Sequence, residues 1–516
     1  MMKKTKIKIT INGQICSGTS GQTILEIAEA NGIRIPNLCH NKELKHYGGC
    51  SLCVVEAENS PKLLRACSSI AADGQVIYTE SERVVRTRKT SIELLMSDHE
   101  GDCVAPCSLN CPAHTDIQGY LKQIALGNDS EAVKIIKEKI SIPASIGRIC
   151  PHPCESNCRR RLVEEPLSVA YLKAFAADND LASDDPYTAV CEESTGKKVA
   201  VIGSGPAGLT CAGDLAKKGY DVTVFEALHL AGGVLVYGIP EFRLPKDIVK
   251  YEIDNLKALG VKIETNMVIG KILSVDELIS MGYEAIFIGS GAGLPLFMGI
   301  EGEDASGVFS ANEYLTRSNL MKAFNEDSTT PIMRGKKVAV VGGGNVAMDA
   351  ARTALRLGAE VHIVYRRSEE ELPARVEEVH HAKEEGIIFD LLTNPIEILE
   401  DENNWVKGMK CVKMALGEPD ASGRRKPVEV EGSEFEMELD TVIMSLGTSP
   451  NPLISSTTEG LETNKWKCIV ADEEFGKTTK EGVFAGGDAV TGAATVILAM
   501  GAGRAAAKGI DEYLSR

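Results

Sequence analysis

The amino-acid sequence predicts a multidomain protein that combines α+β and α/β domains. Two stretches far apart in the chain, residues 199–226 and 338–367, each contain a buried strand, a glycine-rich turn, a helix and a second strand. This order is typical of Rossmann-like dinucleotide-binding domains, which are built on a parallel sheet. Before them, residues 5–11 alternate apolar and polar side chains, and residues 103–158 join a helical pattern to six cysteines. A length of 516 residues allows about three or four domains.

Charge and cysteine content narrow the possible functions. The net charge of −17 argues against general binding of nucleic acids or anionic membranes. The N-terminal stretch continues into alternation rather than an apolar signal segment, and no apolar run is long enough to span a bilayer, so a cytoplasmic location is expected. Fifteen cysteines without a secretion signal favour metal binding over disulfides. Eleven of them lie between Cys16 and Cys158.

The first domain is expected to begin with a strand at residues 5–11, a turn at Asn12-Gly13 and a helix at residues 23–30. A C-x10-C-x2-C-x13-C pattern follows, with a Gly-rich loop around the close pair. Four thiolates so spaced favour a 2Fe–2S cluster; a structural zinc site is the alternative. The predicted ligands are Cys39, Cys50, Cys53 and Cys67.

The surroundings of these cysteines resemble a known domain. From Lys6 to Cys103, including DGQVIYTESERV and the helix that ends LLMSDHEGDC, the chain resembles the N-terminal domain of the large iron–sulphur subunit of respiratory complex I and of multimeric iron-only hydrogenases. The resemblance implies a β-grasp, ferredoxin-like fold with a 2Fe–2S cluster. It also implies partners: an NADH-oxidising FMN iron–sulphur subunit with a small 2Fe–2S subunit, and ferredoxin as a further candidate.

Residues 103–158 contain two cysteine triplets, DCVAPCSLNCP and RICPHPCESNC, each spaced C-x3-C-x3-C. Soft thiolates gathered in this way suit iron–sulphur clusters, with a pair of zinc sites as the alternative. The segment resembles the helical cluster domain of the glutamate synthase small subunit, which recurs in dihydropyrimidine dehydrogenase and in the large subunit of electron-bifurcating transhydrogenase. The resemblance implies one or two 4Fe–4S clusters, one held by Cys103, Cys107 and Cys158, the other by Cys111, Cys150 and Cys154.

Each of these two sets lacks a fourth ligand. His99 stands close to the place of the missing cysteine of the first set and is a candidate ligand. For the second set the family's Gln or Glu position falls on Lys173, which cannot ligate while protonated. Glu164, Glu165 or a water molecule are the remaining candidates.

The first glycine-rich unit is predicted to bind FAD. Gly203 permits the tight turn, Gly205 lets the backbone approach a pyrophosphate, and Gly208 lets helix and strand pack. Glu226 follows the second strand, where an acid can accept hydrogen bonds from a ribose. FAD rather than NAD is inferred from a resemblance of the C-terminal GVFAGGDAVTGAATVILAMGAG to flavoprotein reductases, and AGGVLVYGIPEFRLP resembles a flavin-side loop. The predicted FAD residues are Gly203, Gly205, Pro206, Ala207, Gly208, Glu226, Gly233, Gly487, Asp488 and Thr495.

The second glycine-rich unit is predicted to bind NADPH. Its second strand ends on Tyr365-Arg366-Arg367 rather than on an acid, and guanidinium groups can pair with a 2′-phosphate. An acidic run follows at once, so a solvated arginine pair is the alternative. A thioredoxin-reductase-like dithiol is absent, because Cys411 is the only cysteine of this domain. The predicted NADPH residues are Gly342, Gly344, Asn345, Val346, Ala347, Arg366 and Arg367.

These assignments predict an NADPH-dependent iron–sulphur flavoprotein oxidoreductase in which FAD, and no catalytic side chain, carries the hydride. The resemblances imply a subunit of a larger, electron-bifurcating complex that exchanges electrons among NADPH, NADH and ferredoxin. The alternatives are a glutamate synthase small subunit that feeds an amidotransferase, and a non-catalytic relay. The expected domains are a 2Fe–2S domain (1–88), a helical 4Fe–4S domain (89–190), and an FAD domain (197–290 and 448–516) with an inserted NADPH domain (291–447).

Overall fold

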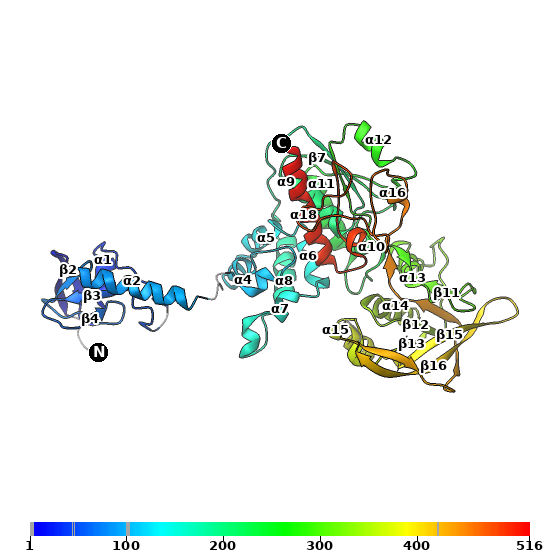
Figure 1. The fold of residues 1–516 in the computed structure, drawn as a ribbon, viewed down its shortest axis with the longest axis horizontal. Coiled ribbons are helices and arrows are strands. Elements are labelled where there is room, and N and C mark those ends of the chain that lie inside the picture. Colours follow the sequence, from blue (N-terminus) through cyan, green and yellow to red (C-terminus); the bar gives the residue numbers. More distant parts are fainter. Residues whose placement is uncertain (1–4, 44, 46, 100–103, 420–422) are drawn as a thin grey trace. The chain divides into compact units, whose positions relative to one another are not determined.

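The computed structural model describes residues 5–43, 45, 47–99, 104–419 and 423–516. The chain divides into two compact units, Met1–Val104 and Ala105–Arg516 (Figure 1). Among the described helices, none is both long enough and apolar enough to cross a membrane.

The first unit is a small sheet with a helix packed on it. Its strands are β1 (Lys6–Ile11), β2 (Gln14–Thr19), β3 (Val54–Ala57), β4 (Leu63–Arg65) and β5 (Val76–Tyr78), in the order β2-β1-β5-β3-β4. The predicted turn is confirmed, because Asn12 and Gly13 both adopt positive φ between the antiparallel strands β1 and β2. The predicted helix is confirmed as α1 (Ile24–Ala30), which Thr23 and Glu26 cap reciprocally.

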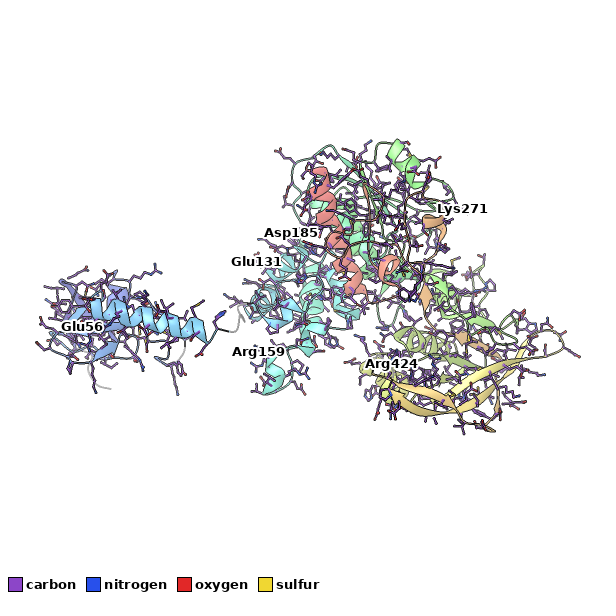
Figure 2. The ribbon with its side chains drawn as sticks, in the orientation of Figure 1. Glu56, Glu131, Arg159, Asp185, Lys271 and Arg424 are labelled. Atoms are coloured by element: carbon purple, nitrogen blue, oxygen red, sulfur yellow. The ribbon has the colours of Figure 1, made fainter. Side chains whose placement is uncertain are left out.

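Helix α2 (Glu82–Ser97) completes this unit. Glu56 on β3, which Figure 2 labels in this unit, lies beside the start of the helix. It accepts hydrogen bonds from Ser81 Oγ at 2.5 Å and from Arg83 Nη1 at 3.1 Å, which ties the helix to the sheet. Arg88 donates to the carbonyl oxygens of Leu52 and Val54. The helix is therefore anchored beside the loop that carries Cys50 and Cys53.

The second unit begins with a helical layer. Its elements are α3 (Pro106–Leu109), α4 (Ile117–Ala125), α5 (Asp129–Lys137), α6 (Pro143–Ile149), α7 (Pro153–Ser156), the short turn η1 (Arg159–Leu162) and α8 (Val169–Leu181). Helices α6 and α8 cross closely at Gly147, where an added Cβ would lie 2.8 Å from Ala174 Cα. This crossing brings the residue after α6, Cys150, near the first turns of α8.

A parallel sheet follows and is completed only by the C-terminal part of the chain. Its strands are β6 (Lys198–Ile202), β7 (Asp221–Phe225), β8 (Lys262–Glu264), β9 (Ala285–Ile288) and β21 (Val483–Ala485), in the order β21-β9-β6-β7-β8. The helices of this part are α9 (Pro206–Lys217), α10 (Val234–Tyr237), α11 (Lys246–Ala258), α12 (Val275–Ser280), α16 (Leu453–Ser456), α17 (Asp488–Thr491) and α18 (Val496–Leu514). Helix α18 packs against α9 and α6 (Figure 1).

A second parallel sheet lies between β9 and β21 in the sequence. It is formed by β11 (Val308–Ser310), β12 (Lys337–Val341), β13 (Glu360–Tyr365), β14 (Ile388–Leu391) and β19 (Thr441–Met444), in the order β11-β19-β12-β13-β14. The two chain crossings between the sheets pair as β10 (Leu294–Pro295) and β20 (Thr448–Ser449). The helices that accompany this second parallel sheet are α13 (Ala311–Leu315), α14 (Asn345–Arg356) and α15 (Val376–Glu384), with the short helical turns η2 (Thr316–Leu320) and η3 (Glu369–Glu371).

An antiparallel sheet packs beside this second sheet. It contains β15 (Thr393–Glu400), β16 (Val406–Pro419), β17 (Arg425–Glu429) and β18 (Phe435–Glu438). Apolar side chains of both sheets, among them Val341, Val364, Met409 and Cys411, form one buried cluster. Cys411 is thus a core residue.

Candidate functional site

In the first unit the structure brings the four predicted cysteine ligands together. The amide of Cys50 lies 3.4 Å from Cys39 Sγ, and the amide of Ala66 donates to the carbonyl of Cys53, next to Cys67. Burial, together with the nearby thiols of Cys67 and Cys50, raises the pKa of Cys53 to about 12. Negative thiolates so close together need a cationic partner, which iron supplies in a cluster.

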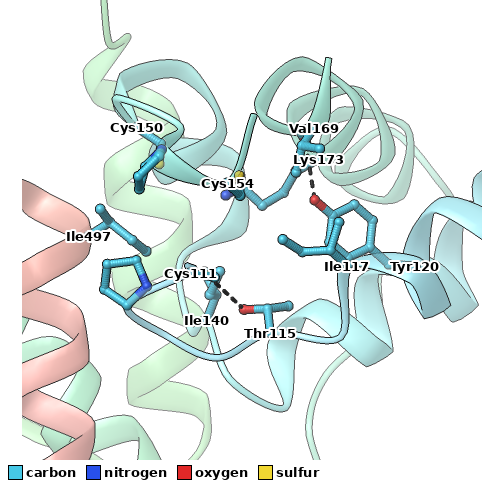
Figure 3. Close-up of a pocket in the computed structure, with 12 residues that line it drawn as sticks. Cys111, Thr115, Ile117, Tyr120, Ile140, Cys150, Cys154, Val169, Lys173 and Ile497 are labelled. Atoms are coloured by element: carbon cyan, nitrogen blue, oxygen red, sulfur yellow. Dashed lines mark hydrogen bonds between the residues drawn. The ribbon is translucent and has the colours of Figure 1, made fainter. Parts of the chain in front are cut away.

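In the second unit three cysteines line one buried cavity. Cys111 lies just after α3, Cys150 just after α6, and Cys154 in α7, and their side chains face the same space (Figure 3). Each is less than a tenth exposed. Burial, together with neighbouring Cys150 and Cys111, raises the pKa of Cys154 to about 12, although the charge of Lys173 acts in the opposite direction. The cavity thus holds three of the six predicted thiolates and one cation.

The other predicted set is only partly described. Cys107 and Cys158 lie near each other, since a charge on Cys158 raises the pKa of Cys107 in addition to the effect of burial. Cys103 lies outside the described residues. His99 is exposed and belongs to the first unit, whereas Cys107 belongs to the second, so its role as a ligand stays a prediction. In the described part of the chain no three His, Cys, Asp or Glu side chains converge as they would on a single metal ion.

Glu164 and Glu165, the two candidate fourth ligands, do not line the cavity of Cys111, Cys150 and Cys154. Glu164 and Glu165 are exposed, and Glu164 forms an ion pair with Arg160. Lys173 lines the cavity instead. The cavity also contains Tyr120 and Thr115, which sequence analysis did not identify; Tyr120 donates a hydrogen bond to the carbonyl of Val169, on the same helix as Lys173.

The loop from β6 to α9 has the geometry that a pyrophosphate requires. Gly203 has φ +97°, and a Cβ there would lie 2.6 Å from the carbonyl oxygen of Gly289. A Cβ on Gly208 would lie 1.9 Å from the carbonyl oxygen of Gly203, so only glycine allows helix and loop to meet. At Gly205 no atom lies within 4 Å of a Cβ, so the N-terminus of α9, which begins with the buried Pro206 and Ala207, faces open space. Free N–H groups and the helix dipole favour an anion there.

Glu226 holds the loop between β6 and α9 in shape through hydrogen bonds, a role that the sequence did not indicate. Its Oε2 accepts hydrogen bonds from the amide and the hydroxyl of Ser204, and its Oε1 accepts from the amide of Leu228. Ser204 Oγ in turn accepts from the amide of Gly232, beside Gly233, where a Cβ would lie 2.8 Å from Gly205 Cα. Only the place of Ser204 between two loop glycines could have indicated this role.

The C-terminal motif meets the same loop. A Cβ on Gly487 would lie 3.0 Å from Ala207 Cβ. Burial raises the pKa of Asp488 to about 6, and its Oδ1 accepts from the amide of Ala494 at 3.2 Å. Thr495 caps the start of α18, where its side chain accepts a hydrogen bond from the amide of Leu498. The first turn of α18 contributes Ile497 to the cavity of Cys111, Cys150 and Cys154, so the start of one helix joins the two sites.

The loop from β12 to α14 repeats the geometry of the first. Gly342 has φ +139°, with its Cβ position 2.2 Å from the carbonyl oxygen of Ser445, and Gly344 faces open space. At the helix start Asn345 Oδ1 accepts from the amide of Arg375, Val346 is half-exposed and Ala347 is buried. The structure therefore leaves room for a second pyrophosphate.

The two arginines after β13 differ. Arg366 is exposed. Arg367 is 8% exposed, and its Nε donates to the carbonyl oxygen of Arg425 at 2.8 Å. Of the two predicted residues, Arg366 is the one whose guanidinium faces solvent.

An ionic network holds the two dinucleotide-binding parts together. Arg243, in the loop after α10, pairs with Asp349 of α14 at 2.7 Å and with Glu378 of α15 at 3.0 Å, and the two carboxylates are buried. Arg375 pairs with Glu378 and donates from Nη1 to the carbonyl oxygen of Cys150. The network thus links the second glycine-rich loop to the cysteine cavity.

Comparison with known proteins places each of these parts in a family. The family model of the pyridine nucleotide-disulphide oxidoreductases matches residues 197–503. A model described as dihydropyrimidine dehydrogenase domain II, 4Fe–4S cluster, matches residues 99–185, and that of the 2Fe–2S iron–sulphur cluster binding domain matches residues 4–82. These matches confirm the expected cluster types and dinucleotide cofactors.

Curated relatives agree with these matches. The chain is 45% identical over 434 residues to the NADP(+)-dependent formate dehydrogenase subunit beta of Moorella thermoacetica, covering 80% of this chain and 60% of that protein. It is 40% identical over 435 residues to the NADPH-Fe(3+) oxidoreductase subunit beta of Geobacter sulfurreducens, covering 80% and 64%. The chain therefore spans less than two thirds of the length of these two relatives.

A shorter relative and a solved structure complete the comparison. The NADPH glutamate synthase small chain of Escherichia coli is 35% identical over 418 residues, which cover 79% of this chain and 88% of that protein. The structure of Mycobacterium tuberculosis FprA in complex with NADPH shares the fold, with a TM-score of 0.53 and 20% identity over 62% of this chain and 85% of that chain. The chain thus belongs to the pyridine nucleotide-disulphide oxidoreductases, in the family of the glutamate synthase small chain, and carries in addition an N-terminal 2Fe–2S domain.

Proposed function

We propose that the chain is an NADPH-dependent iron–sulphur flavoprotein oxidoreductase that works as one subunit of a larger complex. Helix α18 carries the proposal, because Thr495 at its start belongs to the predicted FAD site and Ile497, two residues on, lines the cysteine cavity. When bound, FAD exchanges a hydride with NADPH and single electrons with the clusters. The protein's own task is to hold these groups within reach of each other and apart from water.

The nucleotide-binding residues act through backbone and charge. The N-termini of α9 and α14 present unpaired N–H groups where Gly205 and Gly344 leave open space, which suits two pyrophosphates. Asp488 is buried at the junction of the C-terminal motif with the loop before α9, where its carboxyl group can accept hydrogen bonds from a flavin. Glu226 holds the loop in shape through Ser204.

The preference for NADPH is assigned to Arg366. Its guanidinium is exposed at the carboxyl end of β13, the place where the ribose of a bound dinucleotide lies in this fold. Arg367, the next residue, donates a hydrogen bond to the carbonyl oxygen of Arg425 and so holds the end of β13 in place. A charged hydrogen bond to a 2′-phosphate contributes about 1.5–3 kcal/mol, roughly a ten- to hundredfold preference.

The domain limits and partners form part of this proposal. The domains are 1–88, 89–190, 197–290 with 448–516, and 291–447, and the first is a β-grasp module. The formate dehydrogenase, iron oxidoreductase and glutamate synthase relatives carry subunit or chain names, which supports a partner subunit here. The partner that we propose is an NADH-oxidising FMN iron–sulphur subunit with a small 2Fe–2S subunit, in a complex that bifurcates electrons among NADPH, NADH and ferredoxin. An amidotransferase partner is the second candidate, favoured by the 88% coverage of the glutamate synthase small chain.

The proposal is tested on the anaerobically reconstituted chain. NADPH should bleach the flavin absorbance at concentrations at least tenfold lower than NADH requires. Arg366→Ala should remove most of that preference, whereas Arg34→Ala, which removes an exposed arginine of the first unit, should leave it unchanged. A preference for NADH, or purified protein that holds zinc and no flavin, would refute the proposal. Co-purification then decides between the two partner classes.

A further inference from the structure

Lys173 is a buried cation inside the cysteine cavity. It lies in the second turn of α8, is 5% exposed, and its side chain reaches toward Cys154 among the residues that line the cavity (Figure 3). The close crossing of α6 and α8 at Gly147 holds it there, because Ala174 packs against that glycine. The position is thus set by helix packing.

No carboxylate compensates this charge. Among the residues that the structure describes, no acidic oxygen lies within ion-pair distance of Lys173 Nζ. The nearby Glu155 has other partners: its Oε1 accepts from the amide of Ala170 at 2.9 Å, and its Oε2 lies 3.3 Å from His152 Nδ1. An ammonium in such a cavity is costly unless negative charge lies beside it, so the cavity favours its cysteines as thiolates.

The lining of the cavity indicates what it binds. Cys111, Cys150 and Cys154 supply three negative charges as thiolates, and Thr115 and Tyr120 add only uncharged hydroxyl groups. The other walls are apolar: Ile117, Ile140, Val169 and Ile497. We infer that Lys173 is the counter-charge of a 4Fe–4S cluster held by Cys111, Cys150 and Cys154, and that it stands as a cation where a fourth ligand would otherwise be. An ammonium has three donors and no lone pair, so it stabilises the cluster through charge and N–H···S contacts.

The consequence is a shifted reduction equilibrium. A cation beside a cluster favours the form that has gained an electron, because reduction adds one negative charge, and net charge and hydrogen bonds to sulphur are among the factors that set cluster potentials. Lys173 therefore makes this centre easier to reduce than the same cysteines would alone. This inference rests on the cluster binding of the proposed function.

The experiment measures the potential of this cluster in the whole reconstituted chain by redox titration followed by electron paramagnetic resonance. Lys173→Met should shift the one-electron reduction equilibrium at least tenfold toward the oxidised form, which corresponds to 59 mV. Lys173→Arg, which keeps the positive charge, should shift the reduction equilibrium less than tenfold. Lys122→Met, which removes an exposed lysine of α4, is the matched control. The 2Fe–2S signal of the first unit serves as an internal reference.

Each outcome decides the inference. An unshifted potential in Lys173→Met overturns it. Loss of the cluster in Lys173→Met with retention in Lys173→Arg supports it, because the charge is then required; loss in both overturns it, because shape is then decisive. Strong nitrogen coupling to the cluster in protein labelled with 15N-lysine would show direct ligation and overturn the counter-charge. Wild-type protein that binds no 4Fe–4S cluster, measured as iron and sulphide, would refute the proposed function instead.

Discussion

Glu252→Ala should loosen the start of helix α6. Glu252 lies on α11, is 2% exposed, and accepts hydrogen bonds from the amides of Ala144 at 2.7 Å and Ser145 at 3.0 Å. The residue before α6, Ile142, provides no side-chain cap, so Glu252 takes that role from another part of the chain. Each buried donor that loses its acceptor costs about 1–3 kcal/mol, so the local opening free energy should fall by about 3 kcal/mol.

Hydrogen exchange at the α6 amides measures this loss. About 3 kcal/mol corresponds to exchange on the order of 100-fold faster at Ala144 and Ser145. Glu131→Ala removes an exposed glutamate whose pair with Lys134 contributes about 0–1 kcal/mol, and should change these amides less than about fivefold. Because α6 leads directly into Cys150, the Glu252 variant should also retain less iron. Equal exchange in the two variants would refute the capping role.

The same carboxyl group predicts a pH dependence. Burial raises the pKa of Glu252 from 4.5 to about 7, although hydrogen bonds from Ser145 and Ala144 and the charge of Lys137 lower it. Between these values the folded chain binds more protons than the unfolded chain, so this contribution to stability is complete below pH 4.5 and is lost as the pH rises through 7. Its size is roughly 3 kcal/mol. Glu252→Gln should flatten the slope of unfolding free energy between pH 5 and 8; identical slopes in variant and wild type would contradict the raised pKa.

Three further substitutions test the packing of the dinucleotide-binding parts. Arg243→Met should destabilise the apoprotein by about 3–5 kcal/mol in denaturant unfolding, because it leaves the buried Asp349 without its ion-pair partner. Lys250→Met on the surface should change stability by less than about 1 kcal/mol. Gly208→Ala should lower both flavin content and thermal stability, because its Cβ meets the carbonyl of Gly203 at 1.9 Å. Gly205→Ala should leave thermal stability of the apoprotein unchanged and lose flavin, because its Cβ enters only the open space before α9; normal flavin binding in this variant would show that the pyrophosphate lies elsewhere.

Local chemistry explains what could be predicted from the residues. The turn at Asn12-Gly13 and the cap of α1 depend on backbone sterics and on hydrogen bonds between residues three apart, so their signals are contiguous. The glycine-rich loops are recognised from their local spacing, although Gly203 and Gly342 meet the carbonyl oxygens of distant residues, Gly289 and Ser445. The cysteine spacing likewise indicated cluster chemistry, since few other sites need so many thiolates in one segment.

Long-range packing decided the rest. Cys111 and Cys150 meet only because α3, α6 and α7 fold together, and Lys173 joins them only because Gly147 lets α8 approach α6. Arg367 is adjacent to Arg366 in the sequence, yet β17 supplies the carbonyl that turns it inward.

The sequence by itself therefore determined the chemical classes of this protein: two kinds of cluster domain and two dinucleotide loops. Only the tertiary structure decided which charged groups face the cluster sites and the dinucleotide loops. A motif specifies the backbone shape that it needs, whereas the partner of a buried charge is whichever residue the packing of distant elements brings within a few ångströms.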